Sequence, residues 1–303
     1  MKTPLLLTIL GPSPLQAALN AAQREIAAGN PIALFFNGGD ADLSGFAYQN
    51  ATSLTPATGT DALGVMLDRA YGANNISANR VVNGDFSADA SWTKAAGWTI
   101  EGGELVAASV AGSSSASQAN ALTVGKFYRC GGIVKTISNS TIRFYCGGGG
   151  SGTGRAAPGT YTELLKCAGN GTVLVLATTE ITSATVDDVI YQEVFGYPAR
   201  QATAGSRPTL LKNAAGYYDT VFDGTDDTFV VDLPSAGSPY VMGFSDTGEI
   251  VGAVSATTTA VTVGYPTWSG KKISLFAISA TEPSEQSKRA FRKLAGLLRG
   301  TAY

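Results

Sequence analysis

The sequence predicts a mainly β protein, in which an antiparallel β-sandwich of the jelly-roll type is inserted into a second, sandwich-like β-domain, with short N- and C-terminal α-helices. Three observations predict this class. Strand-like runs recur about every 10–15 residues between residues 81 and 195. Similar runs continue on both sides of that range, whereas apolar residues with helical spacing occur only near the ends. At 303 residues, the chain is long enough for two domains.

Residues 1–30 are predicted to be an N-terminal strand or arm followed by a helix. The apolar run before Gly11 is shorter than the h-region of a secretory signal, which needs about 7–15 apolar residues. A strand or an assembly arm is therefore the prediction, and an export signal is the alternative. Ser13 and Pro14 are suited to begin a helix, and Gly29 is suited to end it.

This first helix has one apolar stripe, formed by Leu15, Leu19, Ala22 and Ile26. Such a stripe either packs on the chain's own sheet or meets other copies of the chain. We favour packing on its own domain, because two heptads are too short to associate stably alone.

Residues 31–80 and 196–280 are predicted to be the two parts of the outer β-domain, called the shell below. The first part contains the apolar runs IALFF and LGVMLDRA, and the second contains YVMGF, EIVGAVS, AVTVGY and KKISLFAIS. Short apolar runs bounded by turn residues are typical of strands. The polar stretch NATSLTPATGTDA is predicted to be a surface loop.

Residues 81–195 are predicted to be the inserted jelly roll, called the module below. The segment WTIEGGELVAASV has two strand-like runs on either side of Gly102-Gly103, which predicts a hairpin. The glycine-rich run from Cys146 to Gly159 is predicted to be a loop. It does not indicate a phosphate-binding turn, because no strand–helix unit surrounds it.

Residues 281–303 are predicted to be a closing helix. Thr281 can cap it, and Pro283 suits its first turn. Acidic residues precede basic ones along it, which is the order that the helix dipole favours. Its apolar face consists of Phe291, Leu294, Ala295 and Leu298. We expect its basic face to be solvated; docking to another subunit is the alternative.

The composition argues against nucleic acid and membranes as partners. Charged residues make up 15% of the chain and the net charge is −2, so no strong attraction to anionic polymers or lipids is expected. A membrane-spanning helix needs about 20 consecutive apolar residues, and the sequence has no such run. Low charge together with 37 glycines fits a surface covered by other subunits, or a protein rich in short turns.

Three cysteines, Cys130, Cys146 and Cys167, all lie within the module. Their spacing matches no zinc motif. Buried thiols are the favoured interpretation, because free cysteine behaves as a small apolar residue. One disulfide is the alternative. The odd number favours synthesis in a reducing cytoplasm.

The chain contains no histidine, which excludes Ser-His-Asp and Cys-His nucleophiles and histidine-based zinc catalysis. One carboxylate cluster stands out, Asp223, Asp226 and Asp227 in the turn FDGTDD. Aspartates in such turns usually bond to nearby backbone, which is the favoured interpretation. The alternatives are calcium binding and hydrolysis of a glycoside by paired carboxylates. We therefore predict that the protein is not an enzyme and has no cofactor, with calcium as the alternative.

Four aromatic residues are candidates for contact with a ligand: Trp92, Tyr128, Tyr145 and Trp268. An exposed ring could stack on a sugar, but a tryptophan in a small β-sandwich is more often part of the core. We expect Trp98 to be in the core, and Trp92 to be either core or platform. Trp268 is predicted to be the most exposed aromatic outside the module.

Two family resemblances follow from particular segments. VVNGDFSADASW, AAGWTIEGGELV and VDDVIYQEV resemble the opening and closing strands of jelly-roll carbohydrate-binding modules, which occur in glycan-degrading enzymes and in bacteriophage tail proteins. ALFFNGGDADLSGF, ATGTDALGVMLDRAYG, RQATAGSRPTLL and YYDTVFDGTDDTF resemble bacteriophage virion proteins with a laminin-G-like, concanavalin-type shell. The end, SATEPSEQSKRAFRKLAGLL, resembles the closing helix of those proteins.

Together, these resemblances imply a structural component of a tailed-bacteriophage virion, such as a tail-fibre, baseplate or other projecting protein made in the cytoplasm of the host bacterium. They imply self-association, which we expect to give a homotrimer, and contact with other virion proteins or with host-surface glycan. One alternative is a glycan-binding subunit or a glycan-active enzyme of the depolymerase type. Another is a capsid-decoration or head-fibre protein.

Overall fold

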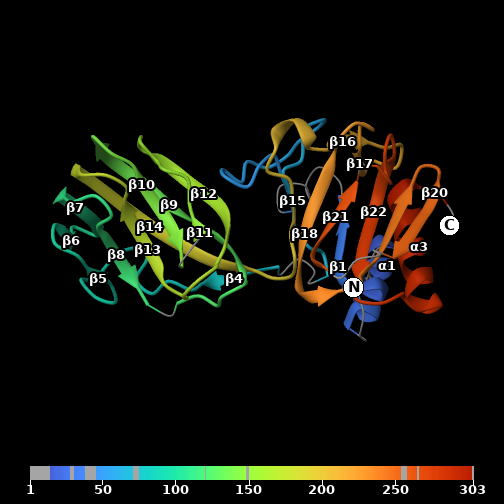
Figure 1. Cartoon of the computed structure of the whole chain (residues 1–303), viewed down its shortest axis with the longest axis horizontal. Helices are drawn as coiled ribbons and strands as arrows, with labels where there is room; N and C mark the ends of the chain where they lie inside the picture. The colour runs from blue at the N-terminus through green and yellow to red at the C-terminus, as the bar shows by residue number, and fades with distance from the viewer. Residues whose placement is uncertain are drawn as a thin grey trace, which may run out of the picture.

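The computed structural model contains two β-sandwiches side by side, the module and the shell (Figure 1). The predicted fold class, a β-sandwich inserted in a second sandwich with N- and C-terminal helices, is confirmed. The structure describes residues 14–27, 31–37, 46–70, 75–119, 121–147, 150–253, 258–264 and 266–301. The predicted N-terminal strand or arm before Pro14 lies outside the described residues.

The module consists of two antiparallel sheets. The first, called the β9 sheet, has the order β12-β9-β14-β7-β6, and β4 also pairs with β14. Its strands are β4 (Ile76–Asn79), β6 (Trp98–Glu101), β7 (Glu104–Val110), β9 (Phe127–Ser138), β12 (Gly159–Lys166) and β14 (Ile181–Val194). The second, the β10 sheet, has the order β11-β10-β13-β8-β5. Its strands are β5 (Thr93–Lys94), β8 (Ser115–Gln118), β10 (Ile142–Cys146), β11 (Gly150–Ser151) and β13 (Val173–Ala177).

The module core lies between these sheets. Buried residues alternate with more exposed ones along β6 and β10, so each sheet turns one face inward. Trp98 is in this core, as predicted, and its indole Nε1 donates to Ser114 Oγ at 3.0 Å. The predicted β6–β7 hairpin is present, and its turn residues Gly102 and Gly103 have φ values of 62° and 79°, which suit glycine.

One strand of the module begins earlier in the chain than the sequence indicated. β4 lies before residue 80, in the range predicted for the shell, but it pairs with β14 of the module. The side chain of Asn79 fastens it there: Nδ2 donates to the Val189 carbonyl at 3.0 Å, and Oδ1 accepts from Tyr191 N at 2.8 Å. Because these contacts are polar, no apolar pattern in the sequence marks β4 as a strand of the module.

The shell also consists of two antiparallel sheets. The β22 sheet has the order β16-β17-β22-β19-β20, with β1 paired to β22. Its strands are β1 (Pro31–Phe36), β16 (Thr209–Lys212), β17 (Tyr218–Val221), β19 (Tyr240–Ser245), β20 (Gly248–Ala253) and β22 (Lys272–Ser279). The β18 sheet has the order β2-β3-β15-β18-β21. Its strands are β2 (Ala47–Tyr48), β3 (Val65–Met66), β15 (Ala199–Arg200), β18 (Thr228–Gly237) and β21 (Thr258–Gly264). Both sheets therefore combine strands from before and after the module.

The strands β1 and β22, within the β22 sheet, are buried on both faces. In β22, Ile273, Phe276 and Ile278 face the sandwich core, whereas Leu275 and Ala277 face two helices. β1 alternates in the same way. Burial on both faces explains why these two strands appear in the sequence as continuous apolar runs.

The helices α1 (Pro14–Ala27) and α3 (Glu285–Arg299) cover the outer face of the β22 sheet (Figure 1). α1 buries Ala18 and Ala22, and packs Leu15 and Leu19 against the same cluster, so this helix lies on its own domain. The side chain of Ile26 is outside the described part of the chain.

The predicted start of the closing helix is wrong. Ser284, and not Thr281, is the N-cap of α3, and its hydroxyl accepts from Ser287 N at 3.2 Å. Gly300 ends the helix with a φ of 67°, in the left-handed region that favours glycine. Its cations pair within the chain: Lys288 contacts Glu282 and Glu285 at 2.7 and 3.0 Å, and Arg292 contacts Glu249 at 2.6 Å.

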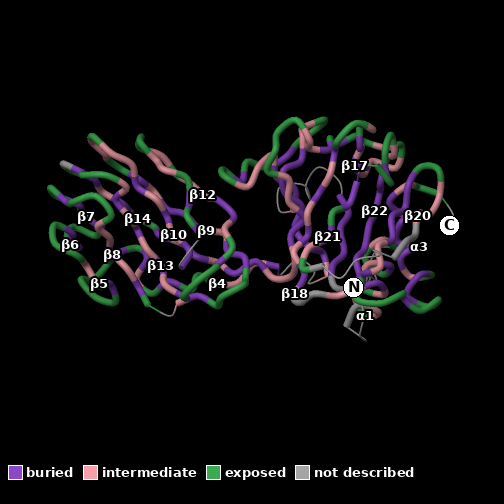
Figure 2. Tube along the Cα trace, viewed as in Figure 1, coloured by how far each residue is buried: buried purple, intermediate pink, exposed green. Residues whose placement is uncertain are grey.

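Burial follows the strands of both sandwiches, while exposed residues gather at the turns (Figure 2). No helix in the described residues is long and apolar enough to cross a membrane.

Candidate functional site

The module and the shell meet through an apolar cluster that we call the junction. It consists of Tyr48, Leu54, Val65, Leu67, Phe127, Leu164 and Val194. Phe127, Leu164 and Val194 come from β9, β12 and β14, and they belong to this cluster and not to the module core. One end of the β9 sheet, on its outer face, therefore packs on shell residues that include Tyr48 of β2 and Val65 of β3. Each side chain fully buried here contributes about 1.5–3 kcal/mol.

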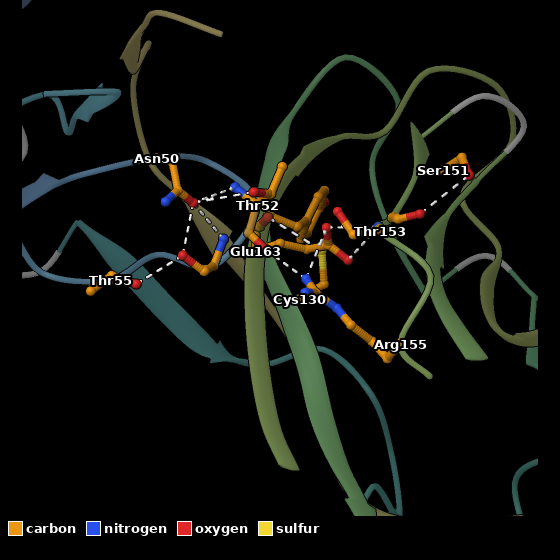
Figure 3. Close-up of polar contacts among 11 residues, drawn as sticks. Asn50, Thr52, Thr55, Cys130, Ser151, Thr153, Arg155 and Glu163 are labelled. Atoms are coloured by element: carbon orange, nitrogen blue, oxygen red, sulfur yellow. Dashed lines mark hydrogen bonds and ion pairs between the residues drawn. The ribbon is translucent and has the colours of Figure 1, made fainter. Parts of the chain in front are cut away.

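Beside the cluster, a shell segment runs along β12, the edge strand of the β9 sheet (Figure 3). Leu164 N donates to the Ala51 carbonyl at 2.8 Å, and Arg155 Nη2 donates to the Thr52 carbonyl at 2.5 Å. Asn50 shapes this segment, because its Oδ1 accepts from Ser53 N at 2.8 Å. The shell thus covers an edge that would otherwise offer a free hydrogen-bonding group.

A buried charge pair supports this contact from the module side. Glu163 is 1% exposed, and its Oε2 lies 3.5 Å from Arg155 Nη2. Thr153 N donates to both carboxylate oxygens, at 3.1 and 2.9 Å. Burial raises the pKa of Glu163, whereas the Thr153 donors and the Arg155 charge oppose the shift. The guanidinium of Arg155 also lies 4.7 Å from the ring centre of Tyr161. Arg155 therefore joins the buried carboxylate to the backbone of the shell.

A second polar group closes the rim of the junction. Asp232 Oδ2 accepts from Arg200 Nη2 at 2.7 Å and from Lys166 Nζ at 3.2 Å. Arg200 belongs to the shell and Lys166 to the module, so one carboxylate links both. The guanidinium of Arg200 also lies 4.7 Å from the ring centre of Phe127. Such half-exposed ion pairs add little stability, on the order of 0–1 kcal/mol, but they fix orientation.

Away from the junction, the outer face of the β9 sheet carries a mainly polar set of side chains that we call the module outer face. It consists of the polar residues Glu104, Lys135, Thr136, Thr185 and Asp187 and the apolar residues Ile133 and Ile190, all exposed or half-buried. Lys135 Nζ contacts Glu104 at 2.7 Å and Asp187 at 2.6 Å, and these two carboxylates raise the pKa of Lys135. The hydroxyls of Thr136 and Thr185 lie 2.9 Å apart. None of these side chains is aromatic, so this face can hydrogen-bond but cannot stack.

The four aromatic candidates are not brought together. Trp92 and Tyr128 are 7% and 1% exposed and lie in the module core, where Trp92 Nε1 donates to the Asn83 carbonyl and Tyr128 Oη accepts from Thr123 N. Tyr145 is half-buried on β10. Neither the Trp92 ring nor the Tyr128 ring is exposed enough to stack on a ligand.

The prediction that Trp268 is exposed is wrong. Trp268 is 3% exposed in the shell core, with ring centres 5.4 Å from Phe222 and 5.3 Å from Phe276. A local hydrogen bond closes its turn, because Trp268 N donates to the Gly264 carbonyl at 2.8 Å. Gly243 makes room for it: a Cβ there would lie 2.9 Å from the indole. Nothing local in the sequence shows that this partner glycine lies opposite the turn.

The carboxylates of Asp223, Asp226 and Asp227 lie within 4.8 Å of one another. They make the predicted turn contacts: Asp227 Oδ2 accepts from Asp223 N, and Asp223 Oδ1 accepts from Thr225 N, both at 2.8 Å. Burial raises the pKa of Asp227, and the neighbouring Asp223 and Asp226 raise it further. Asp223 and Asp226 are exposed and could offer oxygen ligands to a hard cation such as calcium.

Asp68 was missed in the sequence, although an acid within the apolar run LGVMLDRA could have indicated it. It is fully buried, and its Oδ1 accepts from Leu34 N and Ala70 N, both at 2.9 Å. Its Oδ2 accepts from Tyr197 N at 3.2 Å, just after the chain returns from the module. Burial raises the pKa of Asp68 to about 7, against the effect of these three donors. Asp68 therefore ties β1 to both ends of the insertion.

No protein-family model matches the chain, and no curated protein matches it. Among solved structures, one similar chain is the N-terminal CBM22-1–CBM22-2 tandem domain of Xyn10C from Paenibacillus barcinonensis. It has 10% sequence identity and a TM-score of 0.25, and the match covers 65% of this chain and 88% of that chain. A TM-score this low does not establish a common fold, so the fold assignment rests on the sheets described above.

Proposed function

We propose that this chain is a non-catalytic structural protein of a tailed-bacteriophage virion, in which the shell holds the subunit in the particle and the module projects from it. The observation that carries this proposal is the junction. An apolar cluster, a covered edge strand and a shared carboxylate fix the module on the shell, which suits a part that must present a surface at a defined angle.

The sequence supports the same role. The two resemblances together are those of virion proteins, and the absence of histidine removes the commonest proton-transferring side chain. We propose a tail-fibre, baseplate or other projecting component. Its partners would be copies of itself in a trimer, other virion proteins, and host-surface glycan or a neighbouring subunit.

Contact with a partner would use the module outer face. Its hydroxyls and its Lys135-centred ion pairs offer donors and acceptors on a rigid sheet. Individual contacts of this kind are weak, but several modules on one oligomer would act together. Stacking by Trp92, Tyr128 or Trp268 is not part of the proposal, because these rings are buried.

Two measurements test the proposal. Size-exclusion chromatography with light scattering should give an oligomer, and an antibody against the module should label a projecting part of particles whose genome carries this gene. A strictly monomeric protein, or particles without label, would contradict the proposal. Label distributed over the head would instead support the capsid-decoration alternative.

Glycan binding without a virion role is the second candidate, and the polar module outer face favours it. A glycan array with the intact protein tests it, using Lys135→Ala as the variant that removes the centre of the ion pairs and Lys94→Ala as a control elsewhere on the module. Binding lost in the first variant alone would place a glycan site on this face. Binding unchanged in both variants would exclude the face.

A further inference from the structure

The module core contains three thiols that come from separate places in the chain. Cys130 lies in β9, Cys146 ends β10, and Cys167 follows β12. All three are fully buried, and all three are free cysteines. The proposed function does not use them.

Cys146 is the central member of this cluster. Its thiol interacts with the side chains of both Cys130 and Cys167. The Cys167 sulfur lies against the residue that follows Cys146, since a Cβ on Gly147 would be 3.1 Å from Cys167 Sγ. Backbone bonds hold these loops together: Gly147 N donates to the Thr172 carbonyl at 2.8 Å, and Gly169 N donates to the Gly147 carbonyl at 3.2 Å.

A bond between Cys130 and Cys146 would cross the sandwich. Cys130 belongs to the β9 sheet and Cys146 to the β10 sheet. Cys130 Sγ also lies 3.7 Å from the carbonyl of Glu163, whose carboxylate pairs with Arg155 beneath the junction (Figure 3). Cys130 therefore lies beside Glu163, and the next residue, Leu164, donates its N–H to the shell.

The arrangement suits alternative pairs better than a metal site. Within the described part of the chain, the only group of three or more such ligands whose donor atoms lie within 4.8 Å of one another is the Asp223 cluster. The three sulfur atoms therefore do not surround one point, as a thiolate-bound metal would require. Cys146 interacts with each of the other two thiols and lies beside the Cys167 loop, so it is the cysteine that can pair with either of them.

Native packing protects these thiols. Burial raises the pKa of Cys130 well above its ordinary value, and raises the pKa of Cys167 to about 11. The thiolate is the reactive form, so both groups are unreactive while the core is closed. Reaction then requires local opening of the module, or oxidation during folding.

We propose that Cys146 is a shared disulfide partner, which bonds with either Cys130 or Cys167 when the protein meets a low-molecular-weight disulfide such as oxidised glutathione. One cysteine thiolate attacks the oxidant, breaks its S–S bond and releases one glutathione thiol. The second cysteine then attacks the mixed disulfide and releases the other glutathione thiol. Two protein thiols are oxidised, one glutathione disulfide is reduced to two thiols, and the third cysteine stays reduced.

The two bonds would have different effects. A Cys130–Cys146 bond joins the β9 sheet to the β10 sheet across the core, whereas a Cys146–Cys167 bond joins β10 to the loop after β12. Each closes a loop in the unfolded chain, so each should raise the melting temperature of the module by several degrees.

The experiment uses the full chain with oxidised glutathione, in urea well below the unfolding midpoint, followed by alkylation and non-reducing peptide mass spectrometry. We expect Cys130–Cys146 and Cys146–Cys167 peptides, one alkylated cysteine per oxidised chain, and no Cys130–Cys167 peptide. The fully denatured chain is the matched control, and there all three pairs should form.

Single variants complete the test. Cys130→Ala and Cys167→Ala should each keep one disulfide, and Cys146→Ala should lose intramolecular crosslinking. The proposal is overturned by three results: no disulfide in the wild-type chain, a dominant Cys130–Cys167 pair, or undiminished crosslinking in Cys146→Ala. If Cys146→Ala does not fold, the peptide map of the wild-type chain and the other two variants still decide between these outcomes.

Discussion

At the scale of single residues, one buried carboxylate fixes the place where the chain leaves the shell and returns to it. Asp68 accepts hydrogen bonds from Leu34 N, Ala70 N and Tyr197 N, which lie far apart in the sequence. A Cβ at Gly196 would lie 2.3 Å from Asp68 Oδ2, so the returning chain can approach this closely only with glycine there. The φ of Gly196 is 83°, which also favours glycine.

We predict that Asp68→Asn changes how stability depends on pH. The pKa of Asp68 is raised to about 7 in the folded protein, above its ordinary value of about 3.9. Its contribution to stability is therefore fully present below about pH 4, and it is lost as the pH rises through about 7. Relative to the asparagine variant, the wild-type protein should lose on the order of 4 kcal/mol of unfolding free energy between these limits.

Urea unfolding of both proteins across this pH range measures the difference. The exposed Asp246→Asn is the control, and it should leave the wild-type profile in place. An unchanged difference between the wild-type protein and Asp68→Asn at all pH values would contradict the prediction. It would mean that the three N–H donors keep the carboxylate ionised despite its burial.

The second prediction concerns Trp268, for which stability distinguishes a core residue from a binding platform. Trp268→Ala should lower the unfolding free energy by about 3–5 kcal/mol, because it removes a ring packed between Phe222 and Phe276. Trp268→Phe should lose clearly less, since it keeps an aromatic ring in place. Thermal unfolding monitored by circular dichroism gives both values. If Trp268→Ala were as stable as the wild-type protein, the prediction would be contradicted, and the exposed position expected from the sequence would be supported for this ring.

At the scale of elements, the closing helix shows where sequence patterns succeed and fail. The apolar face predicted for it, Phe291, Leu294, Ala295 and Leu298, is buried. The residue that begins it was misplaced, because Thr281 and Ser284 both have the side chain of an N-cap. Only the hydroxyl of Ser284 meets the N–H of Ser287, three positions on.

We predict that Ser284→Ala lowers the unfolding free energy by about 1 kcal/mol, because the Ser287 N–H loses its acceptor. Ser284→Asp keeps an acceptor at the same place and adds a negative charge at the helix N-terminus, so it should be neutral or slightly stabilising. Chemical denaturation of the three proteins provides the comparison. Equal stability of the alanine variant and the wild-type protein would show that the cap contributes nothing.

The same contrast holds for strands and for the candidate site. β1 and β22 were predictable, because burial on both faces makes each a continuous apolar run. β2, β3 and β15 have two residues each, and only their partners define them. The junction was not predictable for the same reason: Phe127, Leu164 and Val194 look like ordinary strand residues until the shell covers them. Local pattern gives the inward face of a sheet, but not what meets its outer face.

At the scale of the whole molecule, the junction decides whether the two sandwiches behave as one body. Inter-domain contacts that are small and polar allow motion, whereas apolar, well-packed contacts resist it. Here apolar residues from three module strands pack against the shell, and hydrogen bonds from Leu164 and Arg155 add to them. We therefore expect the module and the shell to move and unfold together.

The fourth prediction tests this coupling with two valines. Val194 is buried in the junction, whereas Val124 is exposed on the module. Val194→Asp places a charge in the apolar cluster, and burying an unpaired charge is strongly unfavourable. The junction should therefore open while each sandwich keeps its own core. Calorimetry should then resolve two transitions in place of one, and small-angle scattering should give a larger radius of gyration. Val124→Asp makes the same change of side chain in solvent and should resemble the wild-type protein in both measurements.

If Val194→Asp still unfolds in one transition with unchanged scattering, the polar contacts of Arg155, Lys166 and Asp232 are sufficient to hold the module. The apolar cluster would then not be what fixes its angle to the shell.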